Sequence, residues 1–286
     1  MLEQETKWIV ITSKRRTRAP AKKAYSQMSV HLLCYTSVMN SQSIFDYERY
    51  MLIIAHPDDE INCSVLLKNL LNQSKKLKIL LITDGDAGMN ASERGKEMIK
   101  SISAIGLKEE DLIQLNVSEK ELLDKAPEVL SRALSVASEY KADCILGLDY
   151  EGGHEGHDMS CFIANRISQS LGVAHIVYPD YHFRDMHRHG QEFLPERHID
   201  YTIGLNDNDK DLKITVVDAH RGQIGFHLRI QKYQDNYFSL LLDREIYRVF
   251  PSDYNFLDRP SYQIGYEYHR NGFKFSDFVE AIKDMG

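Results

Sequence analysis

The stretch "YMLIIAHPDDE" at residues 50–60 places a histidine and three acids directly after an apolar run. One aspartate here could cap a following helix, because its oxygen accepts free backbone N–H groups and its charge suits the helix dipole. A cap needs only one of Asp58 and Asp59, so His56 and the second aspartate require another explanation. His56 and Asp59 are three residues apart across a strand-to-helix turn, so both side chains can converge on one metal ion.

Two further apolar runs are followed by residues of similar chemistry. "TDGDAG" follows "KLKILLIT", and "GGHEGHD", with His154 and His157, follows "DCILGLD". A catalytic zinc site takes three protein ligands and keeps a fourth position open for water. His157 can supply the third ligand, which leaves Asp58 as a candidate general base and His154 as a candidate acid or oxyanion stabiliser. Two histidines and one carboxylate also suit Fe(II).

Apolar strands that alternate with helices predict how these segments are positioned. Strands are expected at residues 50–56, 76–83, 112–116, 143–149 and 174–180, and helices at 60–74, 92–106, 118–140 (interrupted near Pro127) and 159–172. Strands that are apolar throughout and alternate with helices indicate a parallel sheet covered on both faces. Ligands of such sheets collect beyond the carboxyl ends of the strands, where the histidines and aspartates are found.

The chain after Pro179 has weaker patterns. Residues 181–198 are expected to form a long polar loop, whose histidines (His182, His187, His189) are surface or substrate-rim residues. Residues 210–223 are ambiguous, because "ITVV" favours a strand while the spacing of other apolar residues fits a helix face. A late strand is predicted at 244–250, and a final helix, capped by Ser276, at 276–285.

The motifs "AHPDDE", "TDGDAG" with "ERGKE", and "GGHEGHD" resemble the PIG-L family of zinc-dependent de-N-acetylases. The resemblance covers about residues 50–180 and continues weakly through "AHRGQ" at 219–223, where it favours a helix. It implies a Rossmann-like fold and hydrolysis of an acetamido group, often on a sugar. The residues it implies as metal ligands are His56, Asp59 and His157, with Asp58 as the base and His154 as the second histidine of the pair.

Arg94 and Asp86 are the candidate substrate-binding residues. The resemblance implies that Arg94 is the family's substrate-binding arginine, although a predicted helix with two nearby lysines also suits a solvated arginine. Asp86 lies in the glycine-containing turn, where it either contacts substrate or only shapes the turn.

The sequence departs from the family pattern at two places. The family usually has His-Pro-Asp-His, whereas this chain has Gly156 at the position of that aspartate, which can tune the first histidine. Glu155 and Asp158 are the candidates to replace it. The late stretch has Gly222 where the family often has serine.

Composition limits the function classes. A net charge of −7 and a pI near 5.9 argue against nucleic acid as the main partner, since phosphate binding needs a basic face. Four cysteines without a CxxC pair predict reduced thiols and a cytoplasmic protein. No apolar stretch is long enough to span a membrane, and the N-terminus lacks the pattern of a secretory signal.

A single domain is expected at residues 47–286, after an N-terminal extension at residues 1–46. The extension contains "KRRTRAPAKK", a basic tract that can bind nucleic acid or direct localisation but is expected to be a solvated arm or to precede the true start, at Met28 or Met39.

The site residues together with the family resemblance predict a metal-dependent hydrolase that, as the resemblance implies, removes an N-acetyl group from a small amino-sugar-like substrate. The resemblance favours zinc as the metal, and iron is the alternative. A nucleotide-sugar glycosyltransferase is one alternative, with "DGD" holding a metal-bound diphosphate, but it gives no role to His56 or His157. A catalytically inactive sugar-binding module is the other. The oligomeric state stays open.

Overall fold

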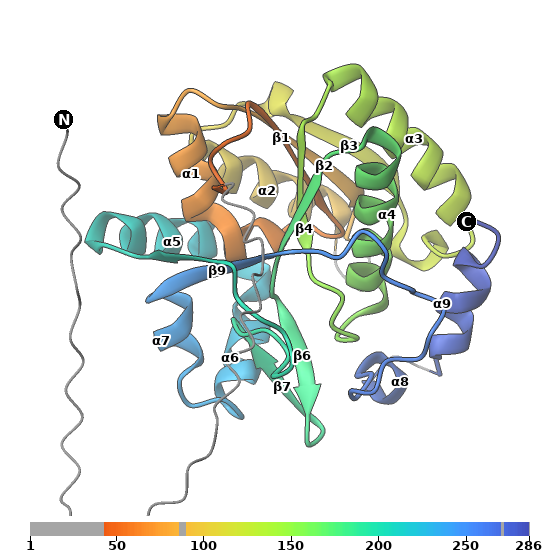
Figure 1. Cartoon of the computed structure of the whole chain (residues 1–286). Coiled ribbons are helices and arrows are strands. Elements are labelled where there is room, and N and C mark those ends of the chain that lie inside the picture. Colours follow the sequence, from red (N-terminus) through yellow and green to blue (C-terminus); the bar gives the residue numbers. More distant parts are fainter. Residues whose placement is uncertain (1–42, 86–89, 270–271, 286) are drawn as a thin grey trace, which may run out of the picture. The chain divides into compact units, whose positions relative to one another are not determined.

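The computed structural model describes residues 43–85, 90–269 and 272–285 (Figure 1). Its central sheet has seven strands in the order β3-β2-β1-β4-β5-β9-β8. The strands are β1 (Arg49–Ile54), β2 (Lys76–Thr83), β3 (Leu112–Val117), β4 (Cys144–Leu148), β5 (Ala174–Tyr178), β8 (Tyr201–Gly204) and β9 (Arg244–Val249). The first five pair in parallel, and β9 and β8 add an antiparallel edge. The predicted mostly parallel α/β sheet is therefore confirmed.

Helices cover both faces of this sheet (Figure 1). They are η1 (Asp59–Cys63), α1 (Ser64–Asn72), α2 (Ala91–Ile105), η2 (Glu109–Asp111), η3 (Glu119–Glu121), α3 (Ala126–Tyr140), α4 (Glu155–Leu171), α5 (Asp207–Ala219), η4 (Arg221–Gln223), α6 (Ile224–Gln231), α7 (Tyr237–Leu241), α8 (Tyr266–His269) and α9 (Phe275–Ile282), where η marks a 3-10 helix. None of the described helices is long and apolar enough to cross a membrane.

Alternate residues of β1 belong to two separate apolar cores, because successive side chains of a strand point to opposite faces. Met51 and Ile53 pack with α3, α4 and α9 on one face. Leu52 and Ile54 pack with α1, α2 and α5 on the other. Burial on both faces explains why this strand has a continuous apolar sequence rather than an alternating one.

The register of the parallel strands aligns their carboxyl ends. Ile53 of β1 lies opposite Leu80 of β2 and Gly147 of β4. The segments that follow these strands therefore leave the sheet at the same edge. This edge carries "HPDDE" after β1 and "GGHEGHD" after β4.

Helix ends show where local sequence signals decided the structure. Gly106 ends α2 in the left-handed conformation, with a φ of 108°, as expected of a glycine after the last helical turn. Pro127 lies in the first turn of α3, where its missing N–H costs nothing, so it starts a helix rather than interrupting one. The predicted helix at 118–140 is accordingly two elements, η3 and α3.

The region after Pro179 differs most from prediction. Residues 181–198 include an antiparallel hairpin, β6 (Tyr181–Arg184) and β7 (His187–Gly190), so the predicted polar loop is wrong there. His182 is buried in this hairpin rather than exposed. Residues 207–219 form α5, so helical spacing prevailed over the strand propensity of "ITVV".

The end of the chain is closer to prediction. The strand β9 is confirmed, but the final helix starts at Phe275, one residue before the predicted Ser276 cap. Lys274 holds the N-cap position, and its backbone N–H donates to Asp277 at 2.8 Å. The predicted extension at residues 1–46 lies almost entirely outside the described residues, as does Asp86.

A buried charge network ties three elements together. Lys213 of α5 forms a fully buried ion pair with Glu245 of β9. Glu245 also accepts from the backbone N–H groups of Val65 and Leu66 at 2.9 Å each, and from the Tyr247 hydroxyl at 2.6 Å. The carboxylate thereby caps the N-terminus of α1, the helix that follows the "HPDDE" segment.

Candidate metal centre and active site

Asp59 holds the loop after β1 in place. One oxygen, Oδ2, accepts from the backbone N–H groups of Ala55 at 2.9 Å and His56 at 2.8 Å. The other oxygen, Oδ1, points to the histidines and is 3.8 Å from His56 Nδ1. Asp59 thus uses one oxygen to bind the backbone of the loop and turns the other toward the histidines, where it can bind a metal ion.

Asp58 does not act as a helix cap, although it occupies the N-cap position of η1. Its side chain makes no capping hydrogen bond. Its φ of 129° is a conformation that residues with side chains rarely adopt, at a cost of about 1–3 kcal/mol. Such strain is typical of functional sites. The side chain faces the same cavity as His56 and Asp59.

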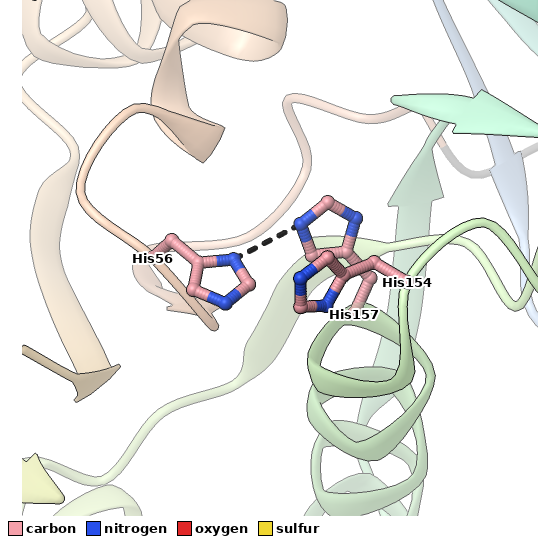
Figure 2. A group of neighbouring side chains, drawn as sticks. All are labelled: His56, His154 and His157. Carbon is pink, nitrogen blue, oxygen red and sulfur yellow. Dashed lines mark hydrogen bonds between the residues drawn. The ribbon is translucent and has the colours of Figure 1, made fainter. Parts of the chain in front are cut away.

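His157 brings the third predicted ligand from the first turn of α4. Its Nε2 atom is 3.1 Å from His56 Nδ1 and 3.3 Å from Asp59 Oδ1. Figure 2 shows His154 and His157 together at the start of this helix, opposite His56, with the 3.1 Å contact dashed. Zinc bonds of about 2.1 Å at tetrahedral angles would separate ligand atoms by about 3.4 Å, so the three atoms fit one ion.

The other nitrogen of His157 is oriented by a carboxylate that the sequence motifs did not indicate. Asp180 Oδ2 lies 3.3 Å from His157 Nδ1, and Asn62 donates to Asp180 Oδ1 at 2.7 Å. A carboxylate behind a ligand histidine fixes its tautomer and raises its basicity. The available signal was the position of Asp180, which ends the stretch predicted as a strand at 174–180, at the same sheet edge.

Charge around His157 favours a cation at the three ligand atoms. Burial alone lowers the pKa of His157, but the carboxylates of Asp59 and then Asp180 outweigh burial and raise that pKa to about 10. The same carboxylates would attract a metal ion, which competes with the proton for the imidazole nitrogen. The cluster can therefore hold a metal ion.

His154 lies in the site but uses its nitrogens elsewhere. Its Nδ1 atom accepts from the backbone N–H of Gly156 at 3.0 Å, which caps α4. Its Nε2 atom is 3.2 Å from Glu119 Oε1, so this nitrogen carries the proton and donates to the carboxylate. Burial lowers the pKa of His154 to about 4, despite the opposing effects of Glu155 and Glu119. These hydrogen bonds make His154 a neutral donor in this structure, although its ring is close to those of His56 and His157 and the three histidines form a group that could hold a metal ion.

Glu119 is a second residue of the site that the sequence motifs did not indicate. It lies in η3, directly after β3, and its carboxylate contacts the histidine whose usual aspartate partner is replaced by Gly156. Of the two predicted replacements, Asp158 instead accepts from the backbone N–H groups of Gly152 and Glu151. Glu155 is 3.5 Å from His154 Nδ1. The available signal was "SEKE" after a predicted strand, since the exits of three other strands of the sheet were already candidate parts of the site.

Arg94 reaches the site from α2 and is buried rather than solvated. Its Nη2 atom donates to Asp58 Oδ1 at 3.0 Å and to the backbone carbonyl of Pro57. Burial raises the pKa of Asp58 to about 7, because loss of solvation outweighs the attraction of Arg94. Arg94 therefore orients the candidate base and also lines the cavity, while Asp86 lies outside the described residues.

One cavity of about 390 Å³ contains all of these side chains. The predicted ligands lie in its wall with Asp58, His154 and Arg94, so the structure brings together every predicted site residue that it describes. Asn62, Glu119 and Asp180 complete this part of the wall. The elements β6, β7 and α6 also contribute to the cavity wall, through Tyr181, Arg188, Phe226 and Arg229.

Comparison with known proteins agrees with this geometry. Residues 51–168 match the family model described as PIG-L: GlcNAc-PI de-N-acetylase. The matched segment runs from β1 to α4 and contains the three predicted ligands with Asp58, His154 and Arg94. No curated protein matches the chain in sequence.

Solved structures with the same fold include several deacetylases. N,N'-diacetylchitobiose deacetylase from Pyrococcus horikoshii is 18% identical, with a TM-score of 0.54, over 72% of this chain and 85% of that chain. The zinc-inhibited form of teicoplanin deacetylase is 12% identical, with a TM-score of 0.53, over 71% and 98%. A deacetylase of an antimicrobial pseudoaglycone is 12% identical, with a TM-score of 0.56, over 73% and 100%.

Proposed function

Residues 51–168 form a PIG-L family domain, and from this premise we propose that the chain is a metal-dependent de-N-acetylase of an amino-sugar-like substrate. The observation that carries the proposal is the convergence of His56, Asp59 and His157 within 3.8 Å of one another, in a cavity that also contains Asp58. Zinc is the proposed metal, because the donor set of two imidazoles and one carboxylate suits it and leaves room for a fourth ligand. A bound zinc ion would supply a Lewis acid that lowers the pKa of water to about 7 and polarises a carbonyl.

Asp58 is the proposed general base. Its carboxylate lies beside the ligand cluster, is not engaged in helix capping, and is held by Arg94 at 3.0 Å. In the proposed reaction it accepts a proton from water as the C–O bond forms at the acetyl carbonyl. It then returns that proton to the nitrogen as the C–N bond breaks, because an amine leaves poorly unless it is protonated. The products are acetate and a free amine.

His154 is the proposed stabiliser of the oxyanion. Its Nε2–H faces the cavity and donates to Glu119 at 3.2 Å in this structure, so in the proposed reaction it would turn from that carboxylate to the developing oxyanion. A donor aimed at developing negative charge is worth about 3–4 kcal/mol in such reactions. In this proposal, His154 acts as a neutral donor and Asp58 alone transfers the proton.

Acetate release separates this function from the alternatives. Zinc-loaded protein is incubated with a panel of N-acetylated sugars, glycolipid headgroups and amino-sugar conjugates, and acetate is measured. We expect acetate from at least one amino sugar and none from the Asp58→Asn variant. Sugar transfer from a nucleotide-sugar without acetate would support a glycosyltransferase instead. Binding without any reaction would support an inactive sugar-binding module.

A further inference from the structure

Two arginines line the cavity beyond the predicted metal ligands. Arg188 lies on β7 and Arg229 on α6. Among the described residues, no carboxylate forms an ion pair with either arginine. Arg94, by contrast, is paired with Asp58 in the same cavity. Arg188 and Arg229 therefore keep N–H groups available to a ligand.

Arg188 is held in place by aromatic rings. Its guanidinium carbon lies 5.2 Å from the ring centre of Tyr181, 5.3 Å from that of Phe226 and 5.7 Å from that of Phe183. An aromatic face attracts a guanidinium but accepts none of its in-plane hydrogen bonds. The side chain is thus fixed before a ligand arrives, which lowers the entropy cost of binding.

Tyr181 connects this arginine to the metal centre. Its ring centre is 5.6 Å from that of His157, and Arg188 lies over the same ring at 5.2 Å. The guanidinium is therefore no farther from the His157 ring than the sum of these two distances. A sugar ring that lies along Tyr181, with its acetamido group at the metal centre, would direct another substituent toward Arg188.

The carboxylates that line the cavity do not neutralise Arg188 and Arg229. Each has a partner close to the metal centre: Asp58 with Arg94 at 3.0 Å, Asp59 and Asp180 with His157 at 3.3 Å each, and Glu119 with His154 at 3.2 Å. The carboxylates of the cavity are thus occupied at the metal centre, whereas Arg188 and Arg229 line the same cavity without a carboxylate partner among the described residues.

We propose that Arg188 and Arg229 bind an anionic group, a carboxylate or a phosphate, on the N-acetylated substrate. Arginine is well suited to this task because its planar fork of donors matches either group in a bidentate arrangement. The inference rests on the proposed deacetylase function and deepens it, because it specifies the charge of the substrate. Neutral amino sugars are then poor substrates.

The test compares substrates that differ only in charge. Acetate release is measured for zinc-loaded protein with N-acetylglucosamine, its 6-phosphate, and N-acetylmuramic acid, which adds a carboxylate. We expect kcat/KM to be about tenfold to a hundredfold higher for at least one anionic sugar than for the neutral sugar, as charge-assisted hydrogen bonds allow. The two anionic sugars distinguish a phosphate site from a carboxylate site.

Variants assign the preference to the two arginines. In Arg188→Gln, the anionic-to-neutral ratio of kcat/KM should fall by about tenfold, mainly through KM, and Arg188→Lys should restore part of it. Arg229 is exposed, so Arg229→Gln tests the site even if Arg188→Gln fails to fold. Arg184→Gln is the matched control, because Arg184 lies on the same hairpin but does not line this cavity. If Arg188 has a purely structural role, its substitution would lower kcat/KM in proportion for both kinds of sugar and leave the anionic-to-neutral ratio unchanged.

Binding measured by calorimetry separates failure of this inference from failure of the proposed function. Acetate release without a preference for anionic sugars, or a preference that survives both arginine variants, overturns the inference and leaves the deacetylase function in place. Arginine-dependent binding of an anionic sugar without acetate release supports the anion site and contradicts the deacetylase function. Equal binding of neutral and anionic sugars overturns the inference whether or not acetate is released.

Discussion

Asp58 and Asp59 are adjacent in sequence but make different contacts. Asp59 uses one oxygen to hold the backbone of Ala55 and His56 and turns the other toward His157. Asp58 makes no capping bond and is held by Arg94. At the scale of single residues, the site therefore separates a proposed ligand from a proposed base.

This difference predicts opposite effects of the same amide substitution. Asp58→Asn should keep about one zinc per chain but lower kcat about 10²- to 10⁴-fold, because an amide cannot accept the water proton. Asp59→Asn should lose most of the metal, because it removes a charged ligand. Metal analysis and acetate release on both variants check this. Equal metal loss in the two variants would reverse our assignment of the aspartates.

His154 supports a second prediction at this scale. His154→Gln should retain the metal and lower kcat about 10²-fold or more with a smaller change in KM, because a misplaced donor stabilises the oxyanion less well than the imidazole. Steady-state kinetics of acetate release measure both parameters. Since Glu119 orients the ring at 3.2 Å, Glu119→Gln should have the same effect in weaker form. A normal kcat in His154→Gln would reduce His154 to a cap of α4.

At the level of helices and strands, the sequence predicted those features that depend on local patterns of apolar residues. Most of the parallel strands follow from largely apolar runs, and their common edge follows from topology, so His56 and His157 could be placed together in advance. Glu119 and Asp180 were not foreseen, because their roles depend on which side chain each meets across the sheet edge. The β6–β7 hairpin was missed because its burial comes from neighbouring elements rather than from an apolar sequence of its own.

The network around Glu245 gives a prediction at the element scale. Glu245→Gln should lower the free energy of unfolding by about 3–5 kcal/mol, because it leaves the Lys213 ammonium buried without a counter-charge. The double variant Lys213→Met with Glu245→Gln should recover part of this loss. Urea unfolding checks both. Glu48→Gln is the control, since its pair with Lys75 is at the surface and should contribute less than about 1 kcal/mol. A loss in Glu245→Gln no larger than in the control would show that the buried pair does not hold α1.

At the scale of the whole molecule, buried neutral histidines should make stability depend on pH. His175 is fully buried, neither ring nitrogen has a hydrogen-bond partner among the described residues, and burial lowers its pKa to about 3, with a smaller effect of Arg248. The unfolded chain binds a proton at His175 below about pH 6.5, whereas the folded chain resists it until about pH 3. The stability due to this difference is complete above pH 6.5 and is lost as the pH falls toward 3.

His175→Leu should therefore flatten the acid side of the stability profile. Between pH 7 and pH 5 the free energy of unfolding should fall by about 2 kcal/mol less in this variant than in the unmodified protein. Urea unfolding at a series of pH values measures the slope, whatever the variant does to stability at pH 7. Parallel profiles for His175→Leu and the unmodified protein would show that His175 is protonated equally in both states.

In the proposed reaction, acetate release depends on one metal ion at His56, Asp59 and His157. The most direct measurement is a zinc titration of metal-depleted protein, with acetate release from an N-acetylated amino sugar measured at each addition. We predict that activity rises in proportion to added zinc and levels off at about one zinc per chain, and that His157→Ala, which lacks one of three ligands, stays inactive at that stoichiometry. Activity that persists in the metal-depleted protein, or a His157→Ala variant with the same titration curve as the unmodified protein, would contradict this role of the metal ion.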